Sequence, residues 1–156
     1  MQRGSYQWHG QPEALPVCHH QHMKVPTTPV SEVPVADSAT AKAHFSRLLA
    51  FETDCWDVHV SLAVEHPDFV LLDVRGPEAF ASGHVAGAVH MPHATLTVEN
   101  LAEYPLDSLF VVYCAGPHCN GADKAARNLA TLGRPVKKMI GGVTGWLDEG
   151  FTLVEG

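Results

Sequence analysis

Cys114 is the side chain best suited to chemistry, because it stands where an apolar run meets a loop and then a helix. The run LFVVY at 109–113 is short and rich in β-branched and aromatic residues, so it predicts a strand buried on both faces. Loop-forming residues follow, with Asn120 placed as an N-cap. Apolar residues then recur at helical spacing until Gly133 ends the helix: Ala122, Ala125, Ala126, Leu129 and Leu132.

This placement predicts that Cys114 is a nucleophile. Free backbone N–H groups and the positive end of the helix dipole favour an anion where a parallel strand ends and a helix begins. They would lower the pKa of the thiol and leave a thiolate at neutral pH. The alternative is that Cys114 is a buried small side chain, which is a common role for a lone cysteine.

Cys119, five residues further on, has two candidate roles. It can resolve a persulfide or a sulfenic acid on Cys114 by forming a disulfide, or it can pass sulfur onward. Alternatively, it is a residue at the start of the helix that packs beneath the loop. Mass spectrometry of the peroxide-treated protein separates these roles.

The charge balance and the cysteine pattern limit the partners and the compartment. Acidic side chains outnumber basic ones by seven and no Lys/Arg cluster is present, so neither nucleic acid nor a membrane surface is an expected partner. The four cysteines have neither zinc-finger spacing nor the density of a small secreted scaffold. No apolar stretch approaches the roughly 20 residues of a membrane span, and the start of the chain lacks a signal-peptide pattern. We therefore expect a cytoplasmic protein.

The domain organisation predicted from composition is an extension followed by one domain. Residues 1–37 are rich in Pro, Gln, His, Ser and Thr, which predicts a flexible or loosely docked segment. Within it, residues 23–35 are either an edge strand or an extended arm, because their prolines exclude them from the middle of a sheet. Four residues within the extension are possible ligands for a soft divalent metal, although their spacing matches no closed structural site: Cys18, His19, His20 and His22. Residues 38–156 are long enough for a single domain.

Strands and helices alternate along this domain, which predicts βα units and a parallel sheet. Helices are expected at 40–51, capped by Ser38 or Thr40, and at 55–64, capped by Asp54. The apolar side of the first would carry Ala41, Phe45, Leu48 and Leu49, and that of the second Trp56, Val60, Ala63 and Val64. Further strands are expected at 69–75, 88–92 and 136–140, and further helices at 77–80 and 143–149.

Several motifs, in the expected order and spacing, resemble a rhodanese-like (sulfurtransferase) domain. They are Asp73-Val74-Arg75, Glu78, Gly83-His84, Gly87-Ala88, Met91-Pro92, Val112-Tyr113-Cys114 and Gly141-Gly142 with Trp146. The resemblance covers about residues 69–150. It implies an α/β fold with a five-stranded, mostly parallel sheet flanked by helices on both faces, and it implies that Cys114 carries the sulfur.

The resemblance and the residues lead to one expected mechanism, which needs no metal and no organic cofactor. Cys114 would take sulfane sulfur from a small-molecule donor such as thiosulfate and pass it to a small-molecule acceptor or an acceptor protein. Loop N–H groups would hold the charge of the persulfide, so the predicted anion-binding residues are Ala115, Gly116, His118, Cys119, Asn120 and Gly121. Asp73 and Arg75 would support the site, or they form a structural ion pair.

The loop departs from the usual family pattern. In the usual pattern, Arg or Lys stands five positions after the cysteine and is followed by Ser or Thr. Counted from Cys114 to Gly133, the loop and helix of this chain are two residues longer than in that pattern. The basic loop residue is absent, and the nearest substitutes are His118, Cys119 and Lys124.

Two other classes of function stay open from the sequence. Related folds with longer loops act as cysteine-dependent phosphatases or arsenate reductases, but phosphoryl transfer needs the strong positive charge that this loop lacks. A non-catalytic binding module with the same fold is the second alternative, and an inert Cys114 thiol would favour it.

Overall fold

The computed structural model describes residues 27–156 of the chain. The chain divides into two compact units, Met1–Ala36 and Asp37–Gly156, and each is described by itself. In the first unit, the described residues 27–36 form a turn in which the Ser31 N–H donates to the Thr28 carbonyl at 2.9 Å, and they form no strand. Of the two alternatives for residues 23–35, an edge strand or an extended arm, the edge strand does not form in this described part, where prolines remove N–H donors. The four residues considered as possible metal ligands lie outside the described residues: Cys18, His19, His20 and His22.

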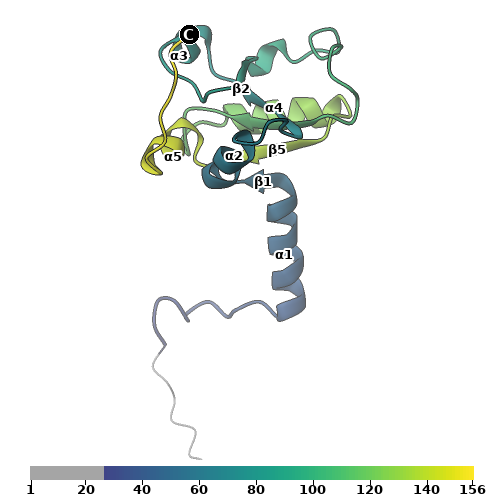
Figure 1. Cartoon of the computed structure of the whole chain (residues 1–156). Helices are drawn as coiled ribbons and strands as arrows, with labels where there is room; N and C mark the ends of the chain where they lie inside the picture. The colour runs from purple at the N-terminus through teal and green to yellow at the C-terminus, as the bar shows by residue number, and fades with distance from the viewer. Residues whose placement is uncertain (1–26) are drawn as a thin grey trace, which may run out of the picture. The chain divides into compact units, whose positions relative to one another are not determined.

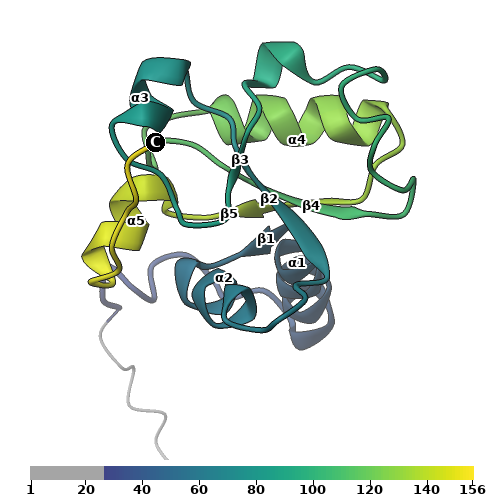
Figure 2. The same cartoon turned by 45° about the horizontal axis from the view of Figure 1, so that its top comes forward.

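The second unit contains a five-stranded sheet with the order β1-β5-β4-β2-β3, in which every strand pair is parallel (Figures 1 and 2). The strands are β1 (Glu52–Thr53), β2 (Phe69–Asp73), β3 (Val89–His90), β4 (Leu109–Tyr113) and β5 (Val136–Met139). The predicted α/β class and five-stranded sheet are confirmed. Strand β1 was not predicted, because two residues are too few for a periodic pattern.

The side chains of the central strands alternate between two apolar clusters, one on each face of the sheet. On one face, Leu72, Phe110 and Val112 pack with the buried residues of α4 (Gly121–Thr131). On the other face, Leu71 and Val111 pack with residues of α2 (Cys55–Leu62) and α5 (Gly142–Asp148). Figure 2 shows α4 on one side of the sheet and α2 on the other. This burial on both faces places β4 in the centre of the domain, with its carboxyl end at the loop that follows.

The remaining helices are α1 (Ser38–Phe51), α3 (Pro77–Ala81) and a 3-10 turn at His93–Thr95. Asp37 caps α1 by accepting from the N–H groups of Ala39 and Thr40, both at 3.0 Å, so the predicted caps Ser38 and Thr40 are wrong. The aspartate carboxylate suits this position because it offers two acceptors to the free N–H groups. No helix in the described part of the chain is both long and apolar enough to cross a membrane.

Two predicted apolar faces are also wrong. Helix α1 buries none of its residues, and Phe45 and Leu49 are 59% and 72% exposed. Helix α2 is capped by Asp54 as predicted, but it buries Cys55 and Val58 rather than the side that carries Trp56 and Val60. Hydropathy ranks side chains by apolar area, whereas the face that a helix buries depends on the elements packed against it.

Candidate functional site

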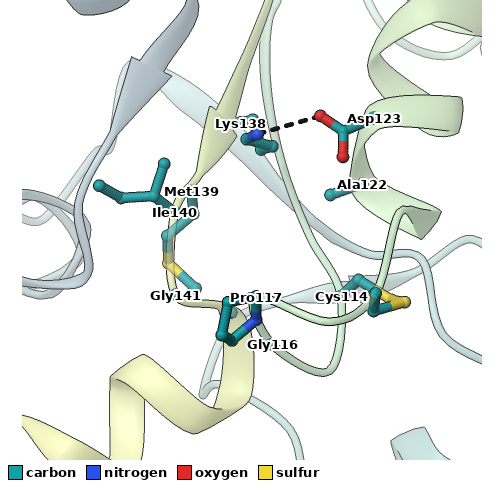
Figure 3. Close-up of a pocket in the computed structure, with 11 residues that line it drawn as sticks. Cys114, Gly116, Pro117, Ala122, Asp123, Lys138, Met139, Ile140 and Gly141 are labelled. Carbon is teal, nitrogen blue, oxygen red and sulfur yellow. Dashed lines mark hydrogen bonds and ion pairs between the residues drawn. A yellow bond between two sulfur atoms is a disulfide. The ribbon is translucent and has the colours of Figure 1, made fainter.

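Cys114 follows β4 directly, and its side chain lies in the wall of a cavity of about 230 Å³. The residue is 7% exposed, so the sulfur is shielded on most sides but reaches the cavity. The walls come from the loop, the start of α4 and the segment from β5 to α5, as Figure 3 shows: Cys114, Gly116, Pro117, Cys119, Ala122, Asp123, Lys138, Met139, Ile140, Gly141 and Gly142.

The turn into α5 holds the first residues of the loop in place. The Val143 N–H donates to the Cys114 carbonyl at 3.0 Å, and the Thr144 N–H donates to the Ala115 carbonyl at 2.9 Å. The Thr144 hydroxyl donates to the same Ala115 carbonyl at 3.1 Å. Gly142 has a positive φ of 59°, and any side chain there would meet the Cys114 carbonyl oxygen, so the two backbones approach closely only because this residue is glycine.

Cys114 and Cys119 are joined by a disulfide, with their Cα atoms 6.3 Å apart. The loop returns to itself through a hydrogen bond from the Cys119 N–H to the Gly116 carbonyl at 3.0 Å. Gly121 lies against both sulfur atoms, because a Cβ there would be 2.8 Å from the Cys114 Sγ and 3.3 Å from the Cys119 Sγ. Its N–H donates to the Cys119 Sγ at 3.4 Å. The loop therefore brings two cysteines together over a glycine.

Several N–H groups of the loop and of the first turn of α4 have no acceptor among the described residues of the protein. They belong to Ala115, Gly116, His118, Asn120, Ala122 and Asp123. Asn120 occupies the N-cap position of α4, as predicted, but its side chain makes no capping hydrogen bond. These donors remain free to bind an anion.

The predicted loop residues differ in their relation to the cavity. Gly116 and Cys119 line it together with Cys114. The side chains of Ala115, His118 and Asn120 are exposed and do not form its walls, and Gly121 lies behind the sulfurs. His118 is therefore not a cation of the cavity, nor is Lys124, which is also exposed and absent from its walls.

The cation of the cavity wall is Lys138 on β5, which was not among the predicted site residues. Its Nζ lies 3.0 Å from a carboxylate oxygen of Asp123 and 3.0 Å from one of Glu52. Burial acts to lower the pKa of Lys138, but these two carboxylates outweigh it and raise the pKa. Two adjacent lysines interrupt the apolar pattern of this strand, but which of them reaches the cavity depends on the register of β5 against β4.

Asp73 and Arg75 are brought together, but not in the cavity wall. The Arg75 Nε donates to both carboxylate oxygens of the fully buried Asp73, at 2.9 and 3.0 Å, and Arg75 Nη2 donates to the Gly83 carbonyl at 2.6 Å. Burial acts to lower the pKa of Arg75, and the hydrogen bonds and charge of Asp73 raise it. The pair joins the end of β2 to the segment after α3, which is the structural alternative considered for these residues.

Cys55 lies on the opposite side of the turn that holds the loop. Its thiol donates to the Ile140 carbonyl at 3.4 Å, and its Sγ lies 3.7 Å from the Gly142 carbonyl oxygen. Burial, with the nearby charges of Asp54 and Glu149, raises the pKa of Cys55 to about 11. The thiol is therefore protonated at neutral pH and serves the packing of this turn.

The family model for the rhodanese-like domain matches residues 59–149. The chain belongs to the rhodanese-like domain family. A solved structure with this arrangement is the BH2092 protein from Bacillus halodurans, which is 30% identical, has a TM-score of 0.73, and is matched over 76% of this chain and 87% of that one.

Two relatives at the sequence level differ in their described activities. Thiosulfate sulfurtransferase GlpE from Pseudomonas syringae is 34% identical over 54% of this chain and 77% of its own length. The HTH-type transcriptional regulator Rv0324 from Mycobacterium tuberculosis is 37% identical over 59% of this chain, and the match spans only 40% of that regulator.

Proposed function

We propose that this chain is a sulfurtransferase that carries sulfane sulfur as a persulfide on Cys114. In the first half-reaction, the Cys114 thiolate bonds to the outer sulfur of a donor such as thiosulfate. The sulfur–sulfur bond of the donor breaks, and sulfite leaves with its electron pair. An acceptor such as cyanide, a thiol or a protein then takes the outer sulfur and regenerates the thiolate, so ping-pong kinetics are expected.

The observation that carries this proposal is the position of Cys114 at the end of β4, in a cavity wall and beside the first turn of α4. Backbone N–H groups of the loop and of the first turn of α4, which have no acceptor among the described residues, are the donors that would stabilise the thiolate and the terminal sulfur of a persulfide. Helix α4 has 11 residues, so its dipole adds to this stabilisation. The description of the Pseudomonas syringae relative as a thiosulfate sulfurtransferase supports the same reaction class here.

The charges near the cavity bear on the choice of donor. Lys138 can attract the sulfonate end of thiosulfate, but Asp123 and Glu52 neutralise much of its charge. A dianion such as thiosulfate therefore gains less binding free energy here than it would from an unpaired arginine in the loop. We propose that backbone amides supply most of the binding of the donor and that thiosulfate binds weakly.

The test begins with protein reduced by dithiothreitol and freed of it, because the disulfide must be open before Cys114 can react. In protein quenched within one turnover of mixing with thiosulfate, the Cys114 peptide should carry the mass of one extra sulfur atom, and cyanide present during turnover should release that sulfur as thiocyanate. Cys114→Ser should do neither. Cys18→Ser is a control that removes another thiol and should behave like the wild-type protein.

The same samples test the other two classes. Hydrolysis of p-nitrophenyl phosphate or reduction of arsenate that requires Cys114, without persulfide formation, would favour a phosphatase or an arsenate reductase. A Cys114 that takes no sulfur and reacts with no substrate would favour a binding module.

A further inference from the structure

We propose that Cys119 resolves the Cys114 persulfide and releases its outer sulfur as hydrosulfide, so that the loop reduces sulfane sulfur at the expense of a dithiol. This inference rests on the proposed sulfurtransferase function and adds a second catalytic residue, a second product and a class of reductant to it.

The pairing of the two sulfurs is the first observation. Cys119 bonds to Cys114 in the folded loop, so its sulfur reaches the Cys114 Sγ with β4 and α4 in place. The hydrogen bond from the Cys119 N–H to the Gly116 carbonyl forms the turn that brings Cys119 back over Cys114.

The surroundings of Cys119 suit an attacking thiolate. The Gly121 N–H donates to its sulfur at 3.4 Å, so a backbone donor points at this sulfur. Gly121 has no side chain, so nothing separates the two sulfurs on that side. Cys119 also lines the same cavity as Cys114, so a departing hydrosulfide has space of about 230 Å³ to enter.

The resolving step balances as follows. The Cys119 thiolate forms a bond to the Cys114 Sγ, and the bond between that Sγ and the outer sulfur breaks. The electron pair goes to the outer sulfur, which takes up a proton from the solvent and leaves as hydrosulfide. The two cysteines are oxidised by two electrons and the outer sulfur is reduced by two. A dithiol reductant then returns two electrons and two protons and reopens the disulfide.

The exposure of the two sulfurs decides where the reductant attacks. Cys114 is 7% exposed, whereas Cys119 is more exposed and lies in the outer part of the loop beside His118. A dithiol should therefore attack the more exposed Cys119 sulfur and expel the Cys114 thiolate. The mixed disulfide with the reductant is then expected on Cys119.

The experiment is a single turnover of reduced, reductant-free protein with thiosulfate, in which sulfite, sulfide and free thiols are measured together. The wild-type protein should release one sulfide for each sulfite and lose two thiols, with the loop disulfide seen in its mass spectrum. Cys119→Ser should release sulfite but no sulfide, and it should retain the persulfide on Cys114. Cys18→Ser is the matched cysteine control and should behave like the wild-type protein.

Three outcomes would overturn the inference. If the wild-type protein retains its persulfide and releases no sulfide, Cys119 does not resolve it, and the proposed function stands alone. If Cys119→Ser still releases sulfide at the wild-type rate, another group performs the step. If neither protein releases sulfite, the proposed function itself fails and the resolving step fails with it.

Discussion

Replacement of Gly121 with alanine would place a methyl group beside both sulfur atoms of the loop. The new Cβ would be 2.8 Å from the Cys114 Sγ, whereas ordinary contacts begin at about 3.4 Å, so this sulfur must move. A displacement of about 1 Å at a reacting atom can slow a reaction roughly 100-fold. We therefore expect Gly121→Ala to slow persulfide formation on Cys114 by about 10- to 100-fold.

The same substitution should have a smaller effect on stability. Overpacking costs roughly 1 to 3 kcal/mol, but alanine in a helix is favoured over glycine by about 1 kcal/mol. The free energy of unfolding should therefore fall by no more than about 2 kcal/mol, measured by urea denaturation.

Gly76→Ala is the matched control, because Gly76 also lies at the start of a helix, has a φ of −70°, and a Cβ added there would meet no atom within 4 Å. This control should form the persulfide at the wild-type rate, as followed by rapid quenching and mass spectrometry of the Cys114 peptide. A folded Gly121→Ala protein that reacts at the wild-type rate would refute the reasoning, because the reacting sulfur would then not occupy the space beside Gly121.

Three further predictions follow from the charged and buried groups. Lys138→Met should raise the KM for thiosulfate roughly two- to fivefold, as expected for a partly exposed charge pair, and Asp123→Asn should lower this KM. If both variants shifted the KM equally and in the same direction, Lys138 would not attract the donor. Arg75→Met should lower the free energy of unfolding by about 3 to 5 kcal/mol, because it leaves the buried Asp73 carboxylate without its ion-pair partner. Lys138→Met should lower the free energy of unfolding by at most about 1 kcal/mol. A similar loss of stability in both variants would contradict this prediction. Because burial raises the pKa of Cys55 to about 11 from an ordinary value of 9.0, the folded protein retains this proton while the unfolded chain loses it, so stability falls as pH rises from about 9 to 11. The wild-type protein should lose about 2 to 3 kcal/mol relative to Cys55→Ala over this range in urea titrations, and parallel pH profiles of the two proteins would contradict it.

The strand, loop and helix around Cys114 were predictable from the sequence because their signals are local. The run at 109–113 contains only buried-strand residues, and the helix after Asn120 shows regular apolar spacing up to Gly133. The structure places both elements within one residue of the predicted bounds. Such agreement is expected where propensity, periodicity and capping all favour one structure.

The other parts of the site depend on contacts between residues that are distant in the sequence. Lys138 reaches the cavity because β5 pairs with β4 in a register that sets Lys138 beside Val112, and no local pattern encodes this register. The buried side of α2 depends in the same way on α5, whose Trp146 packs in the same cluster as Cys55 and Val58. Asp73 and Arg75 were predicted as a pair, but only the folded chain shows that they fasten the segment near Gly83 instead of lining the cavity.

The most direct test of sulfur transfer is to follow the outer sulfur itself. Reduced protein is mixed with thiosulfate radiolabelled in its sulfane sulfur, quenched after one turnover and digested. In Cys119→Ser, the account predicts that the label stays on the Cys114 peptide and that cyanide removes it as thiocyanate. In the wild-type protein, it predicts that the label leaves as sulfide. The sulfite released by both proteins should carry no label. Label that stays in thiosulfate, or that binds equally to Cys114→Ser, would contradict it.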